Sequence, residues 1–182
     1  MANPHPPGID ISDATEASEL YGNLLDTADV GLVVIGTDYA ICHWNQWMHN
    51  RSGLPAEQVL GKQLVGIFPE TRMGRLNQAI KDCLEFGMPA VISPSLNQGA
   101  LPLRPLPQFI ASFERMEQSI RVHPITTSRG EKLCSLTIRD MTLAVQRDRL
   151  LRQQAAELAE LVNQTKRSED RTRAILQNTI DA

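Results

Sequence analysis

Runs of apolar, mostly β-branched positions bounded by turn residues predict five β-strands within the first 140 residues. The first, over residues 30–38, is rich in β-branched side chains and ends in a turn-like Gly-Thr-Asp-Tyr, and the second, over residues 40–44, follows at once. So short a connection predicts a hairpin. The remaining strands are expected over residues 90–96, 119–127 and 132–139, with the Ser-Arg-Gly-Glu turn at 128–131 between the last two.

Capping residues indicate two short helices after the hairpin. Asn45 suits the N-cap of a helix over residues 46–51, because its side chain can accept from the free amides of the first turn. Gly53 is placed to end that helix in a left-handed conformation. Pro55 suits the first position of a second helix that ends before Gly61. Asn45, Gly53 and Gly61 are therefore treated as structural positions.

Two amphipathic helices flank these elements. An N-terminal helix, capped by Ser12 or Asp13, would contain Leu20, and a longer helix over residues 72–86 shows one apolar face. Residues 97–118 carry three prolines and are too proline-dense for a central strand, so we expect an insertion that wraps an edge of the sheet. Strands mixed with helices in this way predict an α+β fold.

The composition changes at Leu143, where Gln, Arg, Glu, Ala and Leu become frequent. A three-four alternation predicts a coiled-coil helix, and the chain offers little further sequence to cover a lone helix of about 30 residues, which would be roughly 45 Å long. We expect a homodimer held by the helix that contains Leu20 and by Leu151, Leu158 and Val162. The expected seam is Ala144, Asp148, Leu151, Ala155, Leu158, Val162 and Thr165, with Asp148 and Thr165 as weak, register-setting positions.

Four short motifs follow one another over residues 20–142. The first is residues 24–26 leading into the apolar run 30–34, and the second is the strand 41–45 closed by asparagine. The third joins residues 51–54 and 57–62, and the fourth is the strand end at 138–142, which contains Asp-x-Thr. In order and content these motifs resemble the PAS domain family of bacterial sensory proteins.

The resemblance implies a five-stranded antiparallel sheet with short helices on one face, an N-terminal helix and a long C-terminal signalling helix. Residues 175–182 can also be laid over residues 24–31, which suggests the opening of a second domain of this kind. The expected organisation is a disordered lead and the start of the N-terminal helix at 1–19, the PAS domain at 20–142, the coiled-coil signalling helix at 143–172, and the start of a second PAS domain at 173–182.

The resemblance also implies a function: a sensory and dimerisation module, not itself an enzyme, that signals through its C-terminal helix to a downstream output domain. Residues 116–120, the proline-rich connection and residues 140–148 resemble modules upstream of diguanylate cyclase or phosphodiesterase domains, so cyclic-di-GMP turnover is the favoured output. Histidine kinases use similar modules. The chain could instead be a catalytic domain of unrecognised type, or a ligand-free dimerisation spacer.

The last motif supplies the candidates for signal transfer. Asp140 can pair with a basic side chain or cap backbone amides, and the Thr142 hydroxyl can cap the helix that follows. Both residues stand where the final strand meets the signalling helix. A role as mere helix caps is compatible with this function.

The candidates for lining a ligand pocket are His43, Trp44, Trp47 and Cys134. An indole ring can wall a planar ligand, although packing in the core or in a dimer contact is the commoner use of such rings. The helix over residues 72–86 lacks the axial histidine of familiar haem-binding PAS domains, and the helix after Asn45 lacks the cysteine of flavin-adduct photoreceptors. We therefore expect neither haem nor flavin. Cys42, His43 and His49 could be considered as metal ligands. We do not expect a metal site, because Cys42 and His43 are adjacent on a strand and therefore point to opposite faces.

Composition narrows the remaining choices. Apolar residues make up 42% of the chain and the net charge is −3, which allows a folded core and gives no reason to expect a nucleic-acid partner. The three cysteines are isolated, and no stretch has the features of a secretory signal or the length of a membrane span. A cytoplasmic location is expected, with a small-molecule ligand as a further possible partner.

Overall fold

The computed structural model describes residues 14–69, 74–94, 100–105 and 115–180. The chain divides into two compact units, Met1–Met141 and Thr142–Ala182. The first unit holds the sheet and its covering helices, and the second is one helix.

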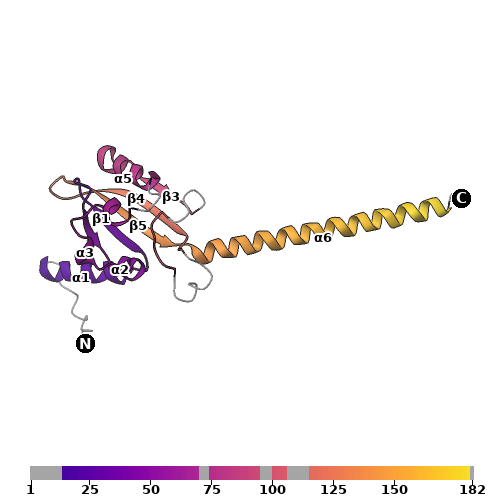
Figure 1. Cartoon of the computed structure of the whole chain (residues 1–182), viewed down its shortest axis with the longest axis horizontal. Helices are drawn as coiled ribbons and strands as arrows, with labels where there is room; N and C mark the ends of the chain where they lie inside the picture. Colours follow the sequence, from indigo (N-terminus) through magenta and orange to yellow (C-terminus); the bar gives the residue numbers. More distant parts are fainter. Residues whose placement is uncertain (1–13, 70–73, 95–99, 106–114, 181–182) are drawn as a thin grey trace, which may run out of the picture. The chain divides into compact units, whose positions relative to one another are not determined.

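A five-stranded antiparallel sheet forms the centre of the first unit (Figure 1). Its strand order is β2-β1-β5-β4-β3, so the hairpin of the first two strands stands at one edge and the third strand at the other. The number of strands and the hairpin are as the sequence predicted, but the third strand is shorter than residues 90–96. The bounds are β1 Gly31–Ile35, β2 Ile41–Trp44, β3 Ala90–Ile92, β4 Gln118–Thr126 and β5 Lys132–Asp140.

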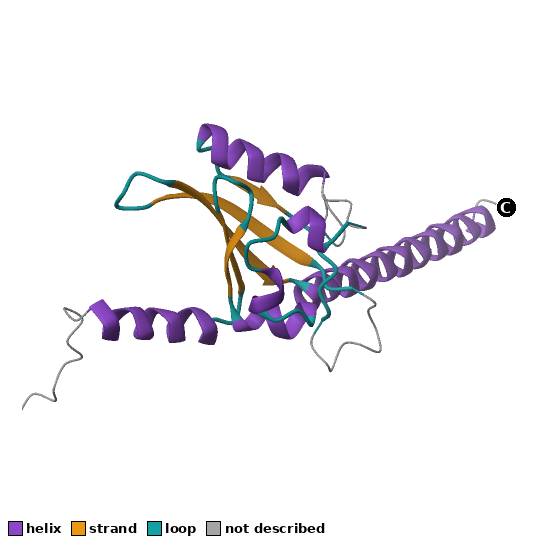
Figure 2. Ribbon diagram, turned by 60° about the vertical axis from the view of Figure 1, so that its left-hand side comes forward, coloured by secondary structure: helices purple, strands orange, loops and turns teal. Residues whose placement is uncertain are grey.

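Helices cover one face of this sheet (Figure 2). The predicted elements are present with shifted ends: Pro55 is the N-cap of its helix and not the first helical residue, and residues 70–73 lie outside the described chain. One element was not predicted at all, the four-residue α4, because so short a segment shows no helical periodicity. The bounds are α1 Ala14–Thr27, α2 Gln46–Ser52, α3 Ala56–Val59, α4 Leu64–Ile67 and α5 Gly74–Phe86.

The core lies between the sheet and these helices. Along β5 every second residue is buried, from Cys134 through Leu136 to Ile138, as expected for a strand with one covered face. α2 approaches β1 so closely at Gly31 that a Cβ there would stand 2.5 Å from Met48 Sδ and 2.8 Å from Trp47 Cε3. Only glycine fits this contact, which brings Trp47 against the sheet.

Part of the connection between β3 and β4 also belongs to the core. Leu101 and Leu103 are fully buried, and the buried Gln118 amide accepts from Leu101 N–H at 3.2 Å and donates to Leu101 O at 2.5 Å. The sequence predicts that residues 97–118 wrap an edge of the sheet, and the buried leucines show that the described part of this connection also contributes to the core. The two leucines bury apolar area, and the Gln118 amide forms hydrogen bonds with the Leu101 N–H and C=O groups that are buried together with them.

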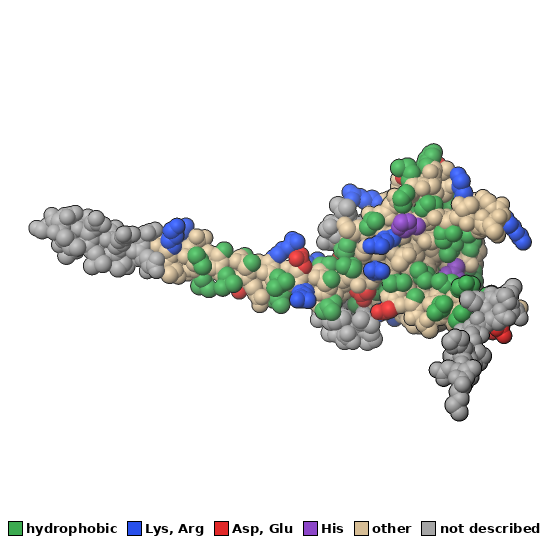
Figure 3. Space-filling view, turned by 180° about the vertical axis from the view of Figure 1, so that it is seen from behind, with side chains coloured by type: hydrophobic (Ala, Val, Ile, Leu, Met, Phe, Trp, Pro, Cys, Tyr) green, Lys and Arg blue, Asp and Glu red, His purple; other side chains and the backbone are tan. Residues whose placement is uncertain are grey.

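The second unit is the helix α6, Thr142–Ile180, which is 39 residues long and so exceeds the predicted 143–172. Its described side chains are almost all exposed, including Leu151, Leu158 and Val162, and Figure 3 shows apolar side chains recurring along it. The proposed start of a second domain at residue 173 falls inside this helix. Within the described residues, no helix combines the length and apolar character of a membrane span.

Candidate ligand cleft and the closed core beside it

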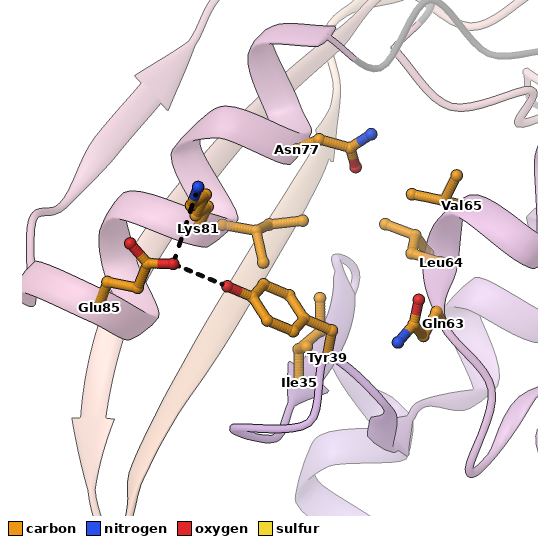
Figure 4. A pocket seen from close by; sticks show the side chains of 9 residues that line it. Ile35, Tyr39, Gln63, Leu64, Val65, Asn77, Lys81 and Glu85 are labelled. Atoms are coloured by element: carbon orange, nitrogen blue, oxygen red, sulfur yellow. Dashed lines mark hydrogen bonds and ion pairs between the residues drawn. The ribbon is translucent and has the colours of Figure 1, made fainter.

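A cleft of about 440 Å³ opens in the first unit between α5, the end of β1 and the segment around α4 (Figure 4). Most of its wall is apolar, and a few polar side chains stand among the apolar ones, which is the usual composition of a small-molecule site. The lining side chains are Ile35, Tyr39, Gln63, Leu64, Val65, Asn77, Ile80, Lys81 and Glu85. The cleft is therefore the candidate functional site.

The turn of the hairpin places one side of the cleft. Gly36 N–H donates to Ala40 O at 2.8 Å, and Tyr39, at a φ of 64°, donates its own N–H to Gly36 O at 3.0 Å. The Gln63 amide then donates to Asp38 O at 3.2 Å, which fastens the segment before α4 to this turn. Two separate segments are thereby held beside one space.

The charged groups of the cleft compensate one another. Lys81 Nζ lies 3.9 Å from Glu85 Oε1 one helical turn away, and the Tyr39 hydroxyl donates to the same carboxylate oxygen at 3.3 Å. Partial desolvation raises the pKa of the Tyr39 hydroxyl, and the nearby negative charge of Glu85 raises it further. The tyrosine therefore stays a neutral donor, and the lining carries one positive and one negative charge that already face each other.

The two tryptophans predicted as pocket walls lie in the closed core and do not line this cleft. Trp44 is buried, donates its indole N–H to Leu54 O at 3.1 Å, and packs on Phe68 with ring centroids 6.4 Å apart. Trp47 is buried against Gly31, with the Arg51 guanidinium 5.3 Å from its ring centroid. Each ring already has its contacts, so its packing role prevails over a ligand-binding one.

His43 and Cys134 are likewise outside the cleft lining. His43 is half-buried opposite Val34, and its buried Nε2 has no hydrogen-bond partner within the described residues. Cys134 is fully buried and its thiol contacts that of Cys83; burial raises the pKa of both thiols. A cysteine held neutral in apolar surroundings is a poor nucleophile.

The predicted structural positions lie at the ends of the short helices. Asn45 is the N-cap of α2: its side-chain oxygen accepts from Met48 N–H at 3.3 Å and from Leu32 N–H at 3.0 Å. Gly53 ends α2 at a φ of 76°. Gly61, at a φ of 75°, donates its N–H to Ile41 O at 2.9 Å and so covers part of the edge strand β2.

Among the described residues, no three histidine, cysteine or acidic side chains come together as possible ligands. Cys42 forms a bulge in β2, because Val34 pairs with His43 while Ile35 pairs with Ile41.

No protein-family model matches the sequence, and no curated protein sequence matches it. Solved structures do match. The structure of an RNA-binding Light-Oxygen-Voltage receptor has a TM-score of 0.55 at 17% identity, over 85% of this chain and 41% of that one. The PAS domain of Bordetella pertussis BvgS has a TM-score of 0.51 at 16% identity, over 78% and 98% of the two chains. A sensory box sensor histidine kinase from Vibrio cholerae has a TM-score of 0.49 at 27% identity, over 72% and 97%.

The first two of these similarities, together with the strand order and the helical cover, decide the architecture. The chain has the PAS fold. Within this PAS fold the cleft lies between the covering helices and the end of β1, while the tryptophans fill the neighbouring core.

The predicted signal-transfer residues stand at the exit from the PAS fold. Asp140 ends β5 opposite Gln118, and the next residue, Met141, donates its N–H to Glu117 O at 2.7 Å. Thr142 is the first residue of α6 and is buried. Their role in signalling remains a prediction.

The predicted dimer contacts are exposed to different degrees. On α1, Leu20 is half-buried and the neighbouring Tyr21 and Leu24 are more exposed. On α6 the seam residues Leu151, Leu158 and Val162 are exposed. These surfaces are available to a partner.

Proposed function

We propose that this chain is a sensory and dimerisation module that converts a change at the cleft into a change in the geometry of α6, and so regulates an output domain. The connectivity of β5 is the observation that carries the proposal. Ile35 lines the cleft and pairs with Cys134 on β5, and the same strand ends at Asp140, two residues before α6 begins. One strand therefore links the wall of the cleft to the exit helix along the chain.

The position of β5 within the sheet makes it suited to this task. It is hydrogen-bonded on both sides, to β1 and to β4, so a displacement at the Ile35 end is shared with its neighbours and is not absorbed by a loose edge. The Met141 N–H bond to Glu117 O anchors the point where the strand ends. The chain itself needs no catalytic step for this function, and we place the module in the cytoplasm.

Dimerisation through α6 follows from its exposed apolar residues. A water-exposed helix with leucine and valine at three-four spacing gains stability by packing them against a second copy. Leu150 and Leu151 provide a matched test, because they are adjacent and equally exposed, at 55% and 54%, but only Leu151 lies in the seam. At tens of micromolar, light scattering should give a dimer mass for the wild type and for Leu150→Lys, and a lower mass for Leu151→Lys. Equal masses for the two variants would contradict this seam.

The output class is proposed on the resemblance of residues 116–120 and 140–148 to modules upstream of diguanylate cyclase and phosphodiesterase domains. A histidine kinase is the alternative. A fusion of residues 1–182 to a diguanylate cyclase domain tests signal transfer directly, because product formation reports how the fused helices are arranged. Replacing Asp140 and Thr142 together by alanine should change the rate of cyclic-di-GMP formation while leaving the circular dichroism spectrum of the module unchanged. An unchanged rate would favour a ligand-free dimerisation spacer.

A further inference from the structure

Two side-chain amides stand across the cleft from each other (Figure 4). Asn77 comes from α5, and Gln63 comes from the segment just before α4. Within the described residues the Asn77 amide makes no hydrogen bond, and Gln63 uses only its NH₂ group, on Asp38 O. Asn77 thus offers a donor and an acceptor to the space, and Gln63 offers an acceptor.

The wall of the cleft also has an apolar part. Ile35 comes from the end of β1 and Ile80 from α5, and Leu64 and Val65 lie next to each other on α4 in Figure 4. Ile35, Leu64 and Ile80 are also members of the buried core, so this part of the wall is held in place by packing. A ligand that fills the space must therefore present an apolar body to this wall and a polar edge to the Asn77 amide.

The charges of the cleft argue against a charged ligand. Lys81 is paired with Glu85, and Glu85 also accepts from Tyr39, so each charge already has a partner of suitable chemistry. A ligand anion would have to share Lys81 with the Glu85 carboxylate, and a ligand cation would have to share Glu85 with Lys81. The pair is exposed, with the Lys81 and Glu85 side chains 54% and 41% accessible, so a neutral ligand can bind beside it without competing for either charge.

We propose that the cleft binds a small uncharged molecule that has an apolar ring system and an adjacent hydrogen-bond donor and acceptor on one edge, as in a lactam. This inference rests on the proposed sensory function and names the ligand class for that site. The lactam N–H and C=O would meet the oxygen and NH₂ of the Asn77 amide, and the ring would cover Ile80 and Leu64. A volume of about 440 Å³ suits a ligand of this size.

Three bicyclic probes test the proposal. Each is titrated into the full chain, and binding is measured by calorimetry and by amide NMR spectra. 2-Quinolone is the neutral lactam, 1-methyl-2-quinolone lacks its N–H donor, and quinoline-2-carboxylate carries a charge. We expect saturable binding of 2-quinolone, about tenfold weaker binding of the methylated compound because one hydrogen bond is lost and an acceptor is left unpaired, and no tighter binding of the carboxylate. The Asn77 side-chain amide signal of the wild type should shift during the titration, so this result does not depend on a variant that folds.

Variants locate the contact. Asn77→Ala should weaken 2-quinolone binding about tenfold. Asn23→Ala is the matched control, because Asn23 is an exposed asparagine on another helix, and it should leave binding unchanged. Lys81→Gln should change the affinity by less than about twofold, since it removes only a surface charge pair that the neutral ligand does not use.

The outcomes separate this inference from the proposed function. Tighter binding of quinoline-2-carboxylate than of 2-quinolone would overturn the ligand class while leaving the cleft as the sensory site. Loss of 2-quinolone binding in Lys81→Gln would do the same. Failure of all three probes to bind would also overturn the inference. The response of the cyclase fusion to the Asp140 and Thr142 substitutions needs no lactam, so that experiment judges the sensory proposal on its own.

Discussion

Asn45 and Asn77 present the same amide to two opposite environments in the first unit. Asn45 is fully buried, accepts from two backbone amides, and donates from its NH₂ group to Leu25 O at 2.9 Å and to Val30 O at 3.0 Å. Asn77 is half-buried beside the cleft and has no hydrogen-bond partner within the described part of the chain. A satisfied amide holds segments together, whereas an unsatisfied one at a cleft is free for a ligand.

The surroundings of the two asparagines differ in the same way. Near Asn45 in the sequence, Trp44 and Trp47 are buried, and Trp47 packs so closely on Gly31 that a Cβ there would clash with it. Around Asn77 the side chains are smaller and leave a cleft. Trp44 and Trp47, which were predicted to line a pocket, therefore lie in the closed region. The polar residues of α5 lie at the open one.

Asn45→Asp should show the largest effect. It keeps the oxygen that caps α2 but replaces the NH₂ donor with an oxygen that faces Leu25 O and Val30 O. We expect a loss of about 3 kcal/mol in the free energy of unfolding at pH 7, measured by urea titration. Burial would raise the pKa of the new carboxyl, so part of the loss should be recovered at pH 5. Asn23→Asp is the exposed control, and a similar loss there would contradict the interpretation.

The buried thiols test how closed the core behind the cleft is. Burial raises the pKa of the Cys134 thiol, and the contact with Cys83 raises it further. An unfolded cysteine ionises near pH 8.5, so this contribution to stability is intact below about pH 8.5 and is lost as the pH rises above it. From pH 7 to pH 10 the free energy of unfolding should fall by about 2 kcal/mol more in the wild type than in Cys134→Ala. Equal falls would mean that water reaches the thiol from the cleft.

Gly31→Ala should have the next largest effect, because its Cβ would enter the space of Met48 Sδ at 2.5 Å. We expect a loss of about 1.5 kcal/mol, as for other overpacked cores, with thermal unfolding as the measurement. Gly22→Ala provides the comparison, because nothing lies within 4 Å of its Cβ and it stands inside α1. That change should stabilise the protein by about 0.5 kcal/mol or more. Equal effects at the two glycines would show that α2 does not pack against β1 this closely.

Asn77→Ala should have the smallest effect on folding. The substitution removes no hydrogen bond within the described residues and places a strong helix former in α5, so the free energy of unfolding should change by less than about 0.5 kcal/mol. Urea unfolding under the conditions used for Asn45→Asp gives the direct comparison. A loss above about 1 kcal/mol in the free energy of unfolding would mean that Asn77 has a structural role like that of Asn45. The two asparagines would then not differ in function.

Features that depend on near neighbours along the chain could be predicted, because local physics decides them. The strand at β5, the N-cap at Asn45 and the left-handed Gly53 after α2 depend on neighbours within a few residues, so their positions could be predicted from the sequence. The order of the motifs indicated the PAS fold in the same way. Where no periodic signal exists, as in the four residues of α4, this reading misses the element.

The tertiary structure alone decided which residues face the cleft. Ile35, Gln63 and Ile80 come from three segments that are brought together by the hairpin turn and by the packing of α5, and nothing local to any of them indicates the others. The bulge at Cys42 also lets both Ile41 and Trp44 be buried, although strict alternation would put them on opposite faces. Long-range contacts thus assigned the tryptophans to the core and the amides to the cleft, because burial depends on what the rest of the chain places on each side of a residue.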